Sequence, residues 1–489
     1  MNSAEGQPNP YEVVVLGAGL SGVCAAIKLK EAGIDNGRIF EKAGDVGGTW
    51  RDNHYPGVAC DVPSHLYSYS FAPNPEWSRW YAPGQEIWDY VRKCATDFDV
   101  YDSISFNTTA TSAAWVGDRW EIQTSSGETC TSRAIISALG GLHTPNVPQL
   151  PGADTFEGVA FHTTNWPDNL DLTGKHVAVV GTGATAVQLV PEIAERAAEL
   201  IVFQRSPVWV GAKKDPEYTE EEREEFRSNP DALKGIRQKL WDSWEYTSVE
   251  LHREGTEINK TAESRARQMI ERSVSDPELA AALTPDHNFA CKRPTMSNSY
   301  YATFERPNVL LVTGAVESVN PTGLVSSGHQ YDADVIVFAT GFKPFNVTNE
   351  IDVSGVGGLP LAEAWAGEIT SYKSVMVHGF PNLFFLMGPN GTGLQSALES
   401  IEPAADFAVR TVSQMQRDGI LALNPKQESV DAFTRDVRDR FKGTTHSKGC
   451  TSWWSEPSGY NHSIWPGSSV EFRELFARLE LDEFDVMRP

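Results

Sequence analysis

Gly17-Ala18-Gly19-Leu20-Ser21-Gly22 and Gly181-Thr182-Gly183-Ala184-Thr185-Ala186 are the two stretches of this 489-residue chain that decide its fold. Each follows a short, valine-rich run typical of a buried strand, over residues 11–16 and 175–180. Each precedes a helix-forming run and then a second short strand. The order strand, glycine turn, helix, strand is typical of a fold that binds a dinucleotide.

The small residues of the two stretches have distinct expected roles. The first glycine permits the tight turn, the second lets the backbone approach a pyrophosphate, and the third small residue packs the helix on the strand. Free amides and the positive end of the helix dipole then face the phosphates. The expected cofactor-binding residues are Gly17, Gly19, Leu20, Ser21 and Gly22 in the first stretch, and Gly181, Thr182, Gly183, Ala184, Thr185 and Ala186 in the second.

A charged residue follows each stretch at the same distance. Glu41 lies 24 residues after Gly17, and Arg205 lies 24 residues after Gly181. In dinucleotide-binding folds, an acid near this place accepts hydrogen bonds from ribose hydroxyls, and an arginine accommodates a 2′-phosphate. Glu41 therefore suits FAD or NAD, and Arg205 suits NADP. One chain with two different dinucleotides indicates redox chemistry.

Composition and charge exclude several classes of partner. The net charge of -24 argues against nucleic acid or an anionic membrane surface as a partner. No uncharged apolar stretch approaches the roughly 18 residues of a membrane-spanning helix, so we expect no membrane insertion. The N-terminus lacks a basic region followed by an apolar core, so no secretory signal is expected.

The six cysteines are scattered along the chain and form no CxxC pair. This spacing argues against a reductase with a redox-active dithiol and gives no zinc pattern, so we expect no metal site. Without a secretory signal, reduced thiols and a cytoplasmic location are expected.

The linker between the two units carries the pattern FxGxxxHxxxWP over residues 156–167. With this motif the chain resembles the type I Baeyer–Villiger monooxygenases, class B flavoproteins that insert one oxygen atom of O2 beside a ketone carbonyl. Related flavin monooxygenases that act on nitrogen or sulfur carry a similar motif, typically without the final Trp-Pro. His162 of the motif is expected to belong to a hinge-and-linker element, without a proton-transfer role.

Residues 47–61 match a second pattern of that family, GGxWxxxxYPGxxxD. A glycine pair after the strand that bears the acid is where FAD-binding folds bring the backbone near the flavin. The resemblance also implies that Asp61 lies near the nicotinamide and a catalytic arginine. The residues expected around FAD are Gly48, Thr49, Trp50, Asp52, Asp61, Val62 and Tyr67.

A third match is Cys291-Lys292-Arg293-Pro294. The resemblance gives Arg293 the catalytic role, because a fixed guanidinium stabilises the anions formed during oxygen insertion and stays protonated in a low-dielectric site. Asp61 would orient Arg293, and Lys292 would join Arg205 and Ser206 around the NADP 2′-phosphate. In Ser452-Trp453-Trp454, Trp453 matches a tryptophan of the family that contacts NADP.

The sequence therefore predicts an α/β fold with two Rossmann-like dinucleotide-binding domains and a helical insertion in the second. The charged, glycine-poor residues between the two parts of the second domain favour helices and could wall a substrate pocket. The expected segments are the first part of the FAD-binding domain (1–143), the linker (144–172), the first part of the NADP-binding domain (173–212), the helical insertion (213–290), the second part of the NADP-binding domain (291–378) and the completion of the FAD-binding domain (379–489).

The resemblance implies that NADPH reduces FAD and that O2 converts a ketone to an ester or lactone through a C4a-peroxyflavin, in a monomer or homodimer. The sequence does not specify the ketone. A monooxygenase for amines or sulfides is the nearest alternative. A pyridine-nucleotide oxidase or ferredoxin-type reductase fits the linker and the Lys292-Arg293 pair less well, and a non-enzymatic flavin-binding protein would leave the NADP stretch unexplained.

Overall fold

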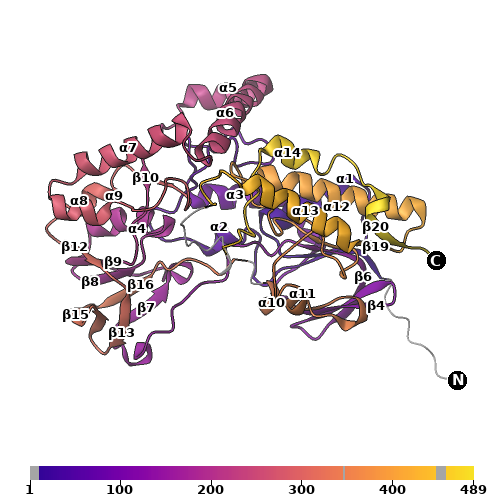
Figure 1. Ribbon diagram of the computed structural model, residues 1–489, viewed down its shortest axis with the longest axis horizontal. Coiled ribbons are helices and arrows are strands. Elements are labelled where there is room, and N and C mark those ends of the chain that lie inside the picture. The colour runs from indigo at the N-terminus through magenta and orange to yellow at the C-terminus, as the bar shows by residue number, and fades with distance from the viewer. Residues whose placement is uncertain (1–9, 345–346, 448–458) are drawn as a thin grey trace.

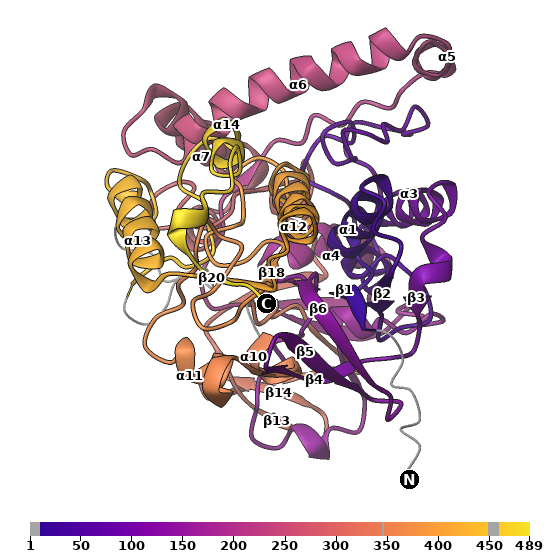
Figure 2. The same cartoon turned by 90° about the vertical axis from the view of Figure 1, so that its right-hand side faces the viewer.

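The computed structural model describes residues 10–344, 347–447 and 459–489. It shows an α/β protein whose two large β-sheets lie side by side, one in each half of the molecule (Figure 1). Helices from the middle of the chain lie along the top of the molecule (Figure 2). The predicted α/β class is confirmed.

The first sheet has eight strands. They are β1 (Tyr11–Leu16), β2 (Gly37–Phe40), β3 (Ile104–Ser105), β4 (Ala110–Val116), β5 (Arg119–Thr124), β6 (Thr129–Ser137), β17 (Asp352–Ser354) and β18 (Leu383–Phe385). β1 lies between β2 and β6, and all three run parallel. Val13, Val14 and Val15 of β1 are fully buried, as expected for a strand covered on both faces. β3 and β18 extend this parallel core, and β4 and β5 add an antiparallel extension to β6.

The second sheet has five strands, all parallel. They are β7 (Val159–His162), β8 (His176–Val180), β9 (Glu199–Gln204), β12 (Val309–Thr313) and β16 (Val335–Phe338). β8 precedes the second glycine stretch and lies between β9 and β16. In both sheets, the strand before the glycine stretch lies between the strand that follows it in the chain and a strand from much later in the sequence: β1 lies between β2 and β6, and β8 lies between β9 and β16. Parallel strands bring their carboxyl ends, and the turns that follow, to one edge of the sheet.

Two helices begin directly at the glycine stretches. They are α1 (Leu20–Glu31) and α4 (Ala184–Ala194). Further helices are α2 (Thr49–Asp52), α3 (Gly84–Asp97), α9 (Tyr300–Thr303), α10 (Val347–Glu350), α11 (Leu361–Ala364), α12 (Leu398–Asp418), α13 (Gln427–Phe441) and α14 (Ser469–Glu474). Two small sheets complete the fold, one of β13 (Val316–Asn320), β14 (Gly323–Ser326) and β15 (His329–Asp332), the other of β19 (Ala422–Pro425) and β20 (Phe484–Met487).

Four helices fill the charged middle segment of the chain. They are α5 (Glu220–Ser228), α6 (Pro230–Leu251), α7 (Glu257–Ser273) and α8 (Pro277–Leu283). Thr219 and Glu222 form a capping box that begins α5. The two short strands that flank the segment, β10 (Val210–Gly211) and β11 (Thr295–Met296), pair with each other and close its neck.

Helix α6 also reaches the half of the molecule that holds the first sheet (Figure 2). Arg237 Nη2 lies 3.2 Å from Glu399 Oε1 of α12, and the indole N–H of Trp241 donates to Glu399 Oε2 at 2.9 Å. Arg473 of α14 also pairs with Glu399. Because Glu399 is buried, its charge depends on these partners, which therefore tie α6 to the first half.

Two sequence-based expectations differ from the structure. β17 pairs with β4 of the first sheet, so residues 352–354 lie with the first half of the molecule. From the sequence, the whole of 291–378 was expected to belong to the second part of the NADP-binding domain. A three-residue strand carries no periodic signal that could have placed it. The expectation of reduced thiols is wrong at Cys291, which is disulfide-bonded, whereas the described thiols of Cys24, Cys60, Cys94 and Cys130 are free.

Within the described ranges, no helix combines the length and the apolar character needed to cross a membrane.

Candidate active site

One large cavity, of about 1010 Å³, lies where the two glycine stretches face each other. Residues of both halves line it, and so do Lys292 and Arg293 from the neck of the helical segment. Among the described residues that the sequence predicts as site residues, all but Gly22 and Ala186 line this cavity. The predicted sites therefore come together in one place.

The first glycine of each stretch has the same local geometry. Gly17 has φ +98°, and Gly181 has φ +113°, a backbone conformation that side chains disfavour. A Cβ would lie 2.7 Å from the Ala138 carbonyl oxygen at Gly17 and 2.5 Å from that of Ala339 at Gly181. Both turns thus pass tightly over the end of the neighbouring parallel strand, β6 or β16.

The second glycine of each stretch opens the backbone to the cavity. Gly19 and Gly183 are the N-caps of α1 and α4, and neither helix has a side-chain hydrogen bond at its cap. A Cβ at Gly183 would meet nothing within 4 Å, and a Cβ at Gly48 would lie 3.1 Å from Gly19 Cα. Both helix N-termini therefore leave amides without a side-chain cap, and the second turn also leaves open space, which is the arrangement that a pyrophosphate needs.

The third small residue of each stretch serves packing, which explains why it does not line the cavity. A Cβ at Gly22 would lie 1.9 Å from the Gly17 carbonyl oxygen, so α1 could not pack this closely with a larger residue. Ala186 is fully buried in the core of the second half.

Glu41 presents a buried, well-positioned carboxylate beside the first turn. Its Oε2 accepts a hydrogen bond from the Ala18 amide at 2.8 Å, and its Oε1 accepts one from the Ala43 amide at 2.9 Å. Arg51 Nη1 donates to the same Oε1 at 3.1 Å. This arginine lies inside the predicted motif, but its role was missed because a pairing across a turn leaves no signal in residue spacing. The arrangement holds the Glu41 carboxylate in one orientation.

A cluster of cations lies beside the second turn. Lys292 Nζ donates to Ser206 Oγ at 3.1 Å, and Thr182 Oγ1 donates to the Ser206 carbonyl at 2.9 Å. Burial, and then the charge of Arg205, lower the pKa of Lys292. The two cations therefore repel each other, and an anion bound between them would relieve this repulsion.

Arg293 and Asp61 form a bidentate ion pair across the cavity between the two halves. Arg293 Nε donates to Asp61 Oδ2 at 2.9 Å, and Nη2 donates to Oδ1 at 2.7 Å. The negative charge of Asp61 raises the pKa of Arg293 above its usual range, and although burial opposes ionisation of Asp61, the guanidinium lowers the pKa of that carboxyl. The Arg293 side chain is still 39% exposed, so part of its guanidinium can meet a ligand.

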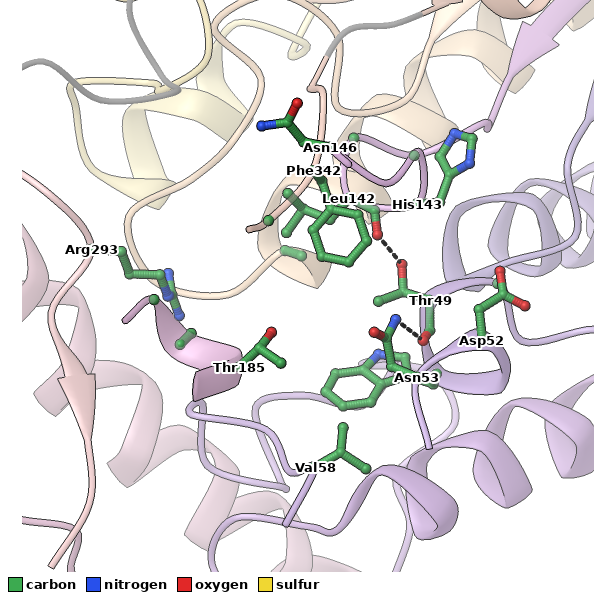
Figure 3. A pocket seen from close by; sticks show the side chains of 18 of the residues that line it. Thr49, Asp52, Asn53, Val58, Leu142, His143, Asn146, Thr185, Arg293 and Phe342 are labelled. Atoms are coloured by element: carbon green, nitrogen blue, oxygen red, sulfur yellow. Dashed lines mark hydrogen bonds between the residues drawn. The ribbon is translucent and has the colours of Figure 1, made fainter. Parts of the chain in front are cut away.

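The remaining flavin residues predicted from the motif lie on the opposite wall. Figure 3 shows Arg293 and Thr185 on one side of the cavity and Thr49, Asp52 and Asn53 on the other. Three further predicted residues, Trp50, Val62 and Tyr67, also line the cavity. The Trp50 indole N–H donates to the Tyr67 hydroxyl at 3.2 Å, and their rings meet edge to face.

The linker motif is explained by packing. His162 is buried, its Nδ1 accepts from the Thr164 amide at 3.3 Å, and its Nε2 therefore carries the proton that it donates to the Gly341 carbonyl at 3.0 Å. Burial lowers the pKa of His162, which favours the neutral ring. A Cβ at Gly158 would lie 2.3 Å from the Asp334 carbonyl oxygen, and the Trp166 carbonyl accepts from His54 at 2.8 Å. The expected structural role of His162 agrees with these contacts.

Several cavity residues were not predicted. Tyr55 donates to Gln188 Oε1 at 2.8 Å, and Gln188 Nε2 donates to the Ala59 carbonyl at 2.8 Å, which ties α4 to the residue 47–61 loop. These contacts join residues more than 100 positions apart, beyond the reach of any local pattern. Leu142, His143, Asn146 and Phe342 lie together at the top of the view in Figure 3. Trp453 lies outside the described residues.

Comparisons with known proteins agree with this geometry. Residues 11–219 match the family model described as flavin-binding monooxygenase-like. The chain is 39% identical over 483 residues to a Baeyer-Villiger monooxygenase of Streptomyces coelicolor, covering 98% of this chain and 93% of that protein. A Baeyer-Villiger monooxygenase of Pseudomonas aeruginosa is 37% identical, with the same coverage.

Solved structures of similar fold cover nearly the whole chain. A cyclohexanone monooxygenase from Rhodococcus sp. Phi1 bound to NADP+ superposes with a TM-score of 0.88 at 30% identity, covering 98% of this chain and all of that one. A complex of OTEMO with FAD and NADP gives a TM-score of 0.88 at 29% identity, with the same coverage. The chain therefore belongs to the Baeyer–Villiger monooxygenase family of flavin-binding monooxygenases.

Proposed function

We propose that this protein is an FAD-containing, NADPH- and O2-dependent monooxygenase that converts ketones to esters or lactones. The observation that carries the proposal is that two anion-binding turns, with charges of opposite sign beside them, open into one cavity that also holds the Arg293–Asp61 pair. Relatives named Baeyer-Villiger monooxygenase and similar structures with FAD and NADP support the same activity.

The residues present fit both cofactors. At the first turn, Glu41 would accept hydrogen bonds from the FAD ribose, and the uncapped N-terminus of α1 at Gly19 would face the pyrophosphate. At the second turn, Gly183 would face the NADP pyrophosphate, while Arg205 and Lys292 would hold the 2′-phosphate. Bound FAD would supply the redox chemistry, taking a hydride from NADPH and activating O2.

Arg293 would act as a catalytic residue on the oxygen anion that develops as the ketone is attacked. Its charge is permanent, and Asp61 occupies Nε and one N–H of Nη2, which leaves the other guanidinium N–H groups to point at a ligand. Fixed donors of this kind stabilise a developing oxyanion without reorganisation, at about 3 kcal/mol for each donor. Asp61 would serve as the positioning residue.

We assign the two sheets to two Rossmann-like domains, FAD-binding and NADP-binding, with the helical segment inserted in the second. The strand order around each glycine stretch and the closed neck at β10–β11 support this division. The pairing of β17 with β4 suggests that the chain returns to the FAD-binding domain before residue 352. The cytoplasmic location and the monomeric or homodimeric state stay predictions.

Reduction and product analysis test the function together. The purified holoprotein should be yellow, lose its colour with NADPH under nitrogen, and convert members of a ketone panel to esters in air. Arg293→Ala should keep the NADPH-dependent bleaching and lose ester formation by about 150-fold, the equivalent of about 3 kcal/mol. Arg306→Ala removes an exposed arginine outside the cavity and should leave both steps unchanged.

Undiminished ester yield in Arg293→Ala would remove this arginine from the mechanism. Sulfoxide formation without any ester from the ketone panel would instead favour a heteroatom monooxygenase.

A further inference from the structure

Residues 139–146, which we call the strap, run along the cavity directly after β6. Leu139, Gly140, Gly141, Leu142, His143 and Asn146 of the strap line the cavity. Leu142, which lines the cavity, is 41% exposed. The strap also faces Glu41 and Lys42, which line the same cavity at the end of β2. It therefore borders the place where the first turn and its acid would hold a dinucleotide.

Side chains tie the strap to both sides of this place. Thr49 Oγ1 of α2 donates to the Leu142 carbonyl at 3.2 Å (Figure 3). Lys42 Nζ lies 3.3 Å from His143 Nδ1, and His143 Nε2 lies 3.2 Å from Glu350 Oε2 of α10. Glu350 also accepts a hydrogen bond from Thr144. The strap is thus held between β2 and α2 on one side and α10 on the other.

The chain of contacts through His143 has one consistent direction. An ammonium group can only donate, so His143 Nδ1 accepts from Lys42, and the ring proton on Nε2 is donated to the Glu350 carboxylate. The imidazole of His143 then bridges the ammonium group of Lys42 and the carboxylate of Glu350. The contact of Lys42 is exposed to solvent, so it can break and re-form without disturbing the core.

We propose that Lys42, His143 and Glu350 form a latch that holds the strap over the adenosine half of FAD and slows release of the cofactor. This inference rests on the proposed function, which places FAD at the first turn. The three residues act through the strap, as positioning residues. The latch is a local device, so its loss would change the lifetime of the bound flavin more than the fold.

The latch can be tested on the holoenzyme by the rate of FAD release, followed by the rise of free flavin fluorescence after dilution. Lys42→Ala removes the donor, and His143→Phe keeps the ring and removes both nitrogens. We expect each to release FAD about 3- to 10-fold faster, as for the loss of one modest polar contact. Because both act through one contact, the double variant should be no faster than the faster single variant.

A matched control separates the latch from a general effect of charge. The backbone amide of Lys343 donates a hydrogen bond to the Thr144 carbonyl of the strap at 2.9 Å, and Lys343 does not line the cavity. Lys343→Ala should leave FAD release unchanged. Melting temperatures of the apoproteins should agree closely among all variants, because the Lys42 contact is exposed and contributes little to the stability of the fold.

The other outcomes overturn the proposal in recognisable ways. Faster release in Lys42→Ala alone would mean that the lysine contacts the cofactor directly. Multiplicative effects in the double variant would mean that the two residues act independently, and unchanged release in both would remove the latch. A purified protein that takes up no FAD would overturn the proposed function and the latch with it.

Discussion

The choice of NADPH over NADH is the sharpest prediction about the second half of the molecule. Arg205 and Lys292 lie beside the second turn, where Lys292 donates to the Ser206 hydroxyl. Burial and the repulsion from Arg205 lower the pKa of Lys292. A 2′-phosphate would add negative charge between the two cations, whereas NADH offers only a hydroxyl.

The magnitude follows from the exposure of the two cations. Hydrogen bonds to charged groups contribute about 1.5–3 kcal/mol each. Arg205 is exposed and Lys292 is half-buried, so we take the low end for the first and the middle of the range for the second. The double variant Arg205→Ala/Lys292→Ala should therefore lose about 3 kcal/mol of NADPH binding, or roughly 150-fold, after allowance for non-additivity.

Steady-state kinetics with both coenzymes provide the assay. KM for NADPH should rise roughly 150-fold in the double variant, while KM for NADH should change less than about threefold. Arg306→Ala, which removes a comparable exposed charge outside the cavity, should change neither. An equal rise for both coenzymes would refute the reasoning, because it would place the two cations at the shared part of the dinucleotide or in the fold itself.

Three further predictions address other parts of the structure. Gly183→Ala should leave the melting temperature unchanged, because its Cβ meets nothing within 4 Å, yet raise KM for NADPH about tenfold by narrowing the pyrophosphate space. Asp61→Asn replaces the two carboxylate oxygens that accept from Arg293 by one amide oxygen, and the ion pair is partly exposed. Ester yield should therefore fall about fivefold in a product assay, and H2O2 release should rise in a peroxide assay. Burial lowers the pKa of His65 from 6.5 to about 4. Between these two pH values the unfolded chain binds a proton at His65 that the folded protein does not bind, so the free energy of unfolding falls as the pH drops from 6.5 towards 4. His65→Phe should reduce that loss by about 1.6 kcal/mol between pH 6.5 and 5 in urea titrations, and an unchanged pH slope would show that His65 does not titrate in this way.

Local chemistry made the dinucleotide turns predictable from the sequence. Gly17 and Gly181 have the positive φ angles that a tight turn requires, and Gly22 allows the close packing of α1 that the motif implies. Glu41 and Arg205 could be identified because in each unit the strand after the helix leads back to the same edge of the sheet, and the charged residue directly follows that strand. These features depend on a few adjacent residues, so the local sequence pattern is enough to predict them.

Contacts between distant segments could not be predicted in the same way. The Glu399 cluster joins α6, α12 and α14, and the Tyr55–Gln188 contact joins the two halves, yet neither leaves a periodic signal. The disulfide at Cys291 and the pairing of β17 with β4 were missed for the same reason. The ion pair of Arg293 with Asp61 could be expected only through the family resemblance. The roles of these residues in catalysis stay predictions.

Oxygen incorporation tests the central claim most directly. The purified holoprotein would be supplied with NADPH, a panel of aliphatic, cyclic and aryl ketones, and ¹⁸O-labelled O2, and the products would be analysed by mass spectrometry. We predict an ester or lactone that carries one labelled oxygen atom, formed in proportion to the NADPH consumed. NADPH consumption that yields only H2O2 across the panel, or an ester without label, would contradict the account.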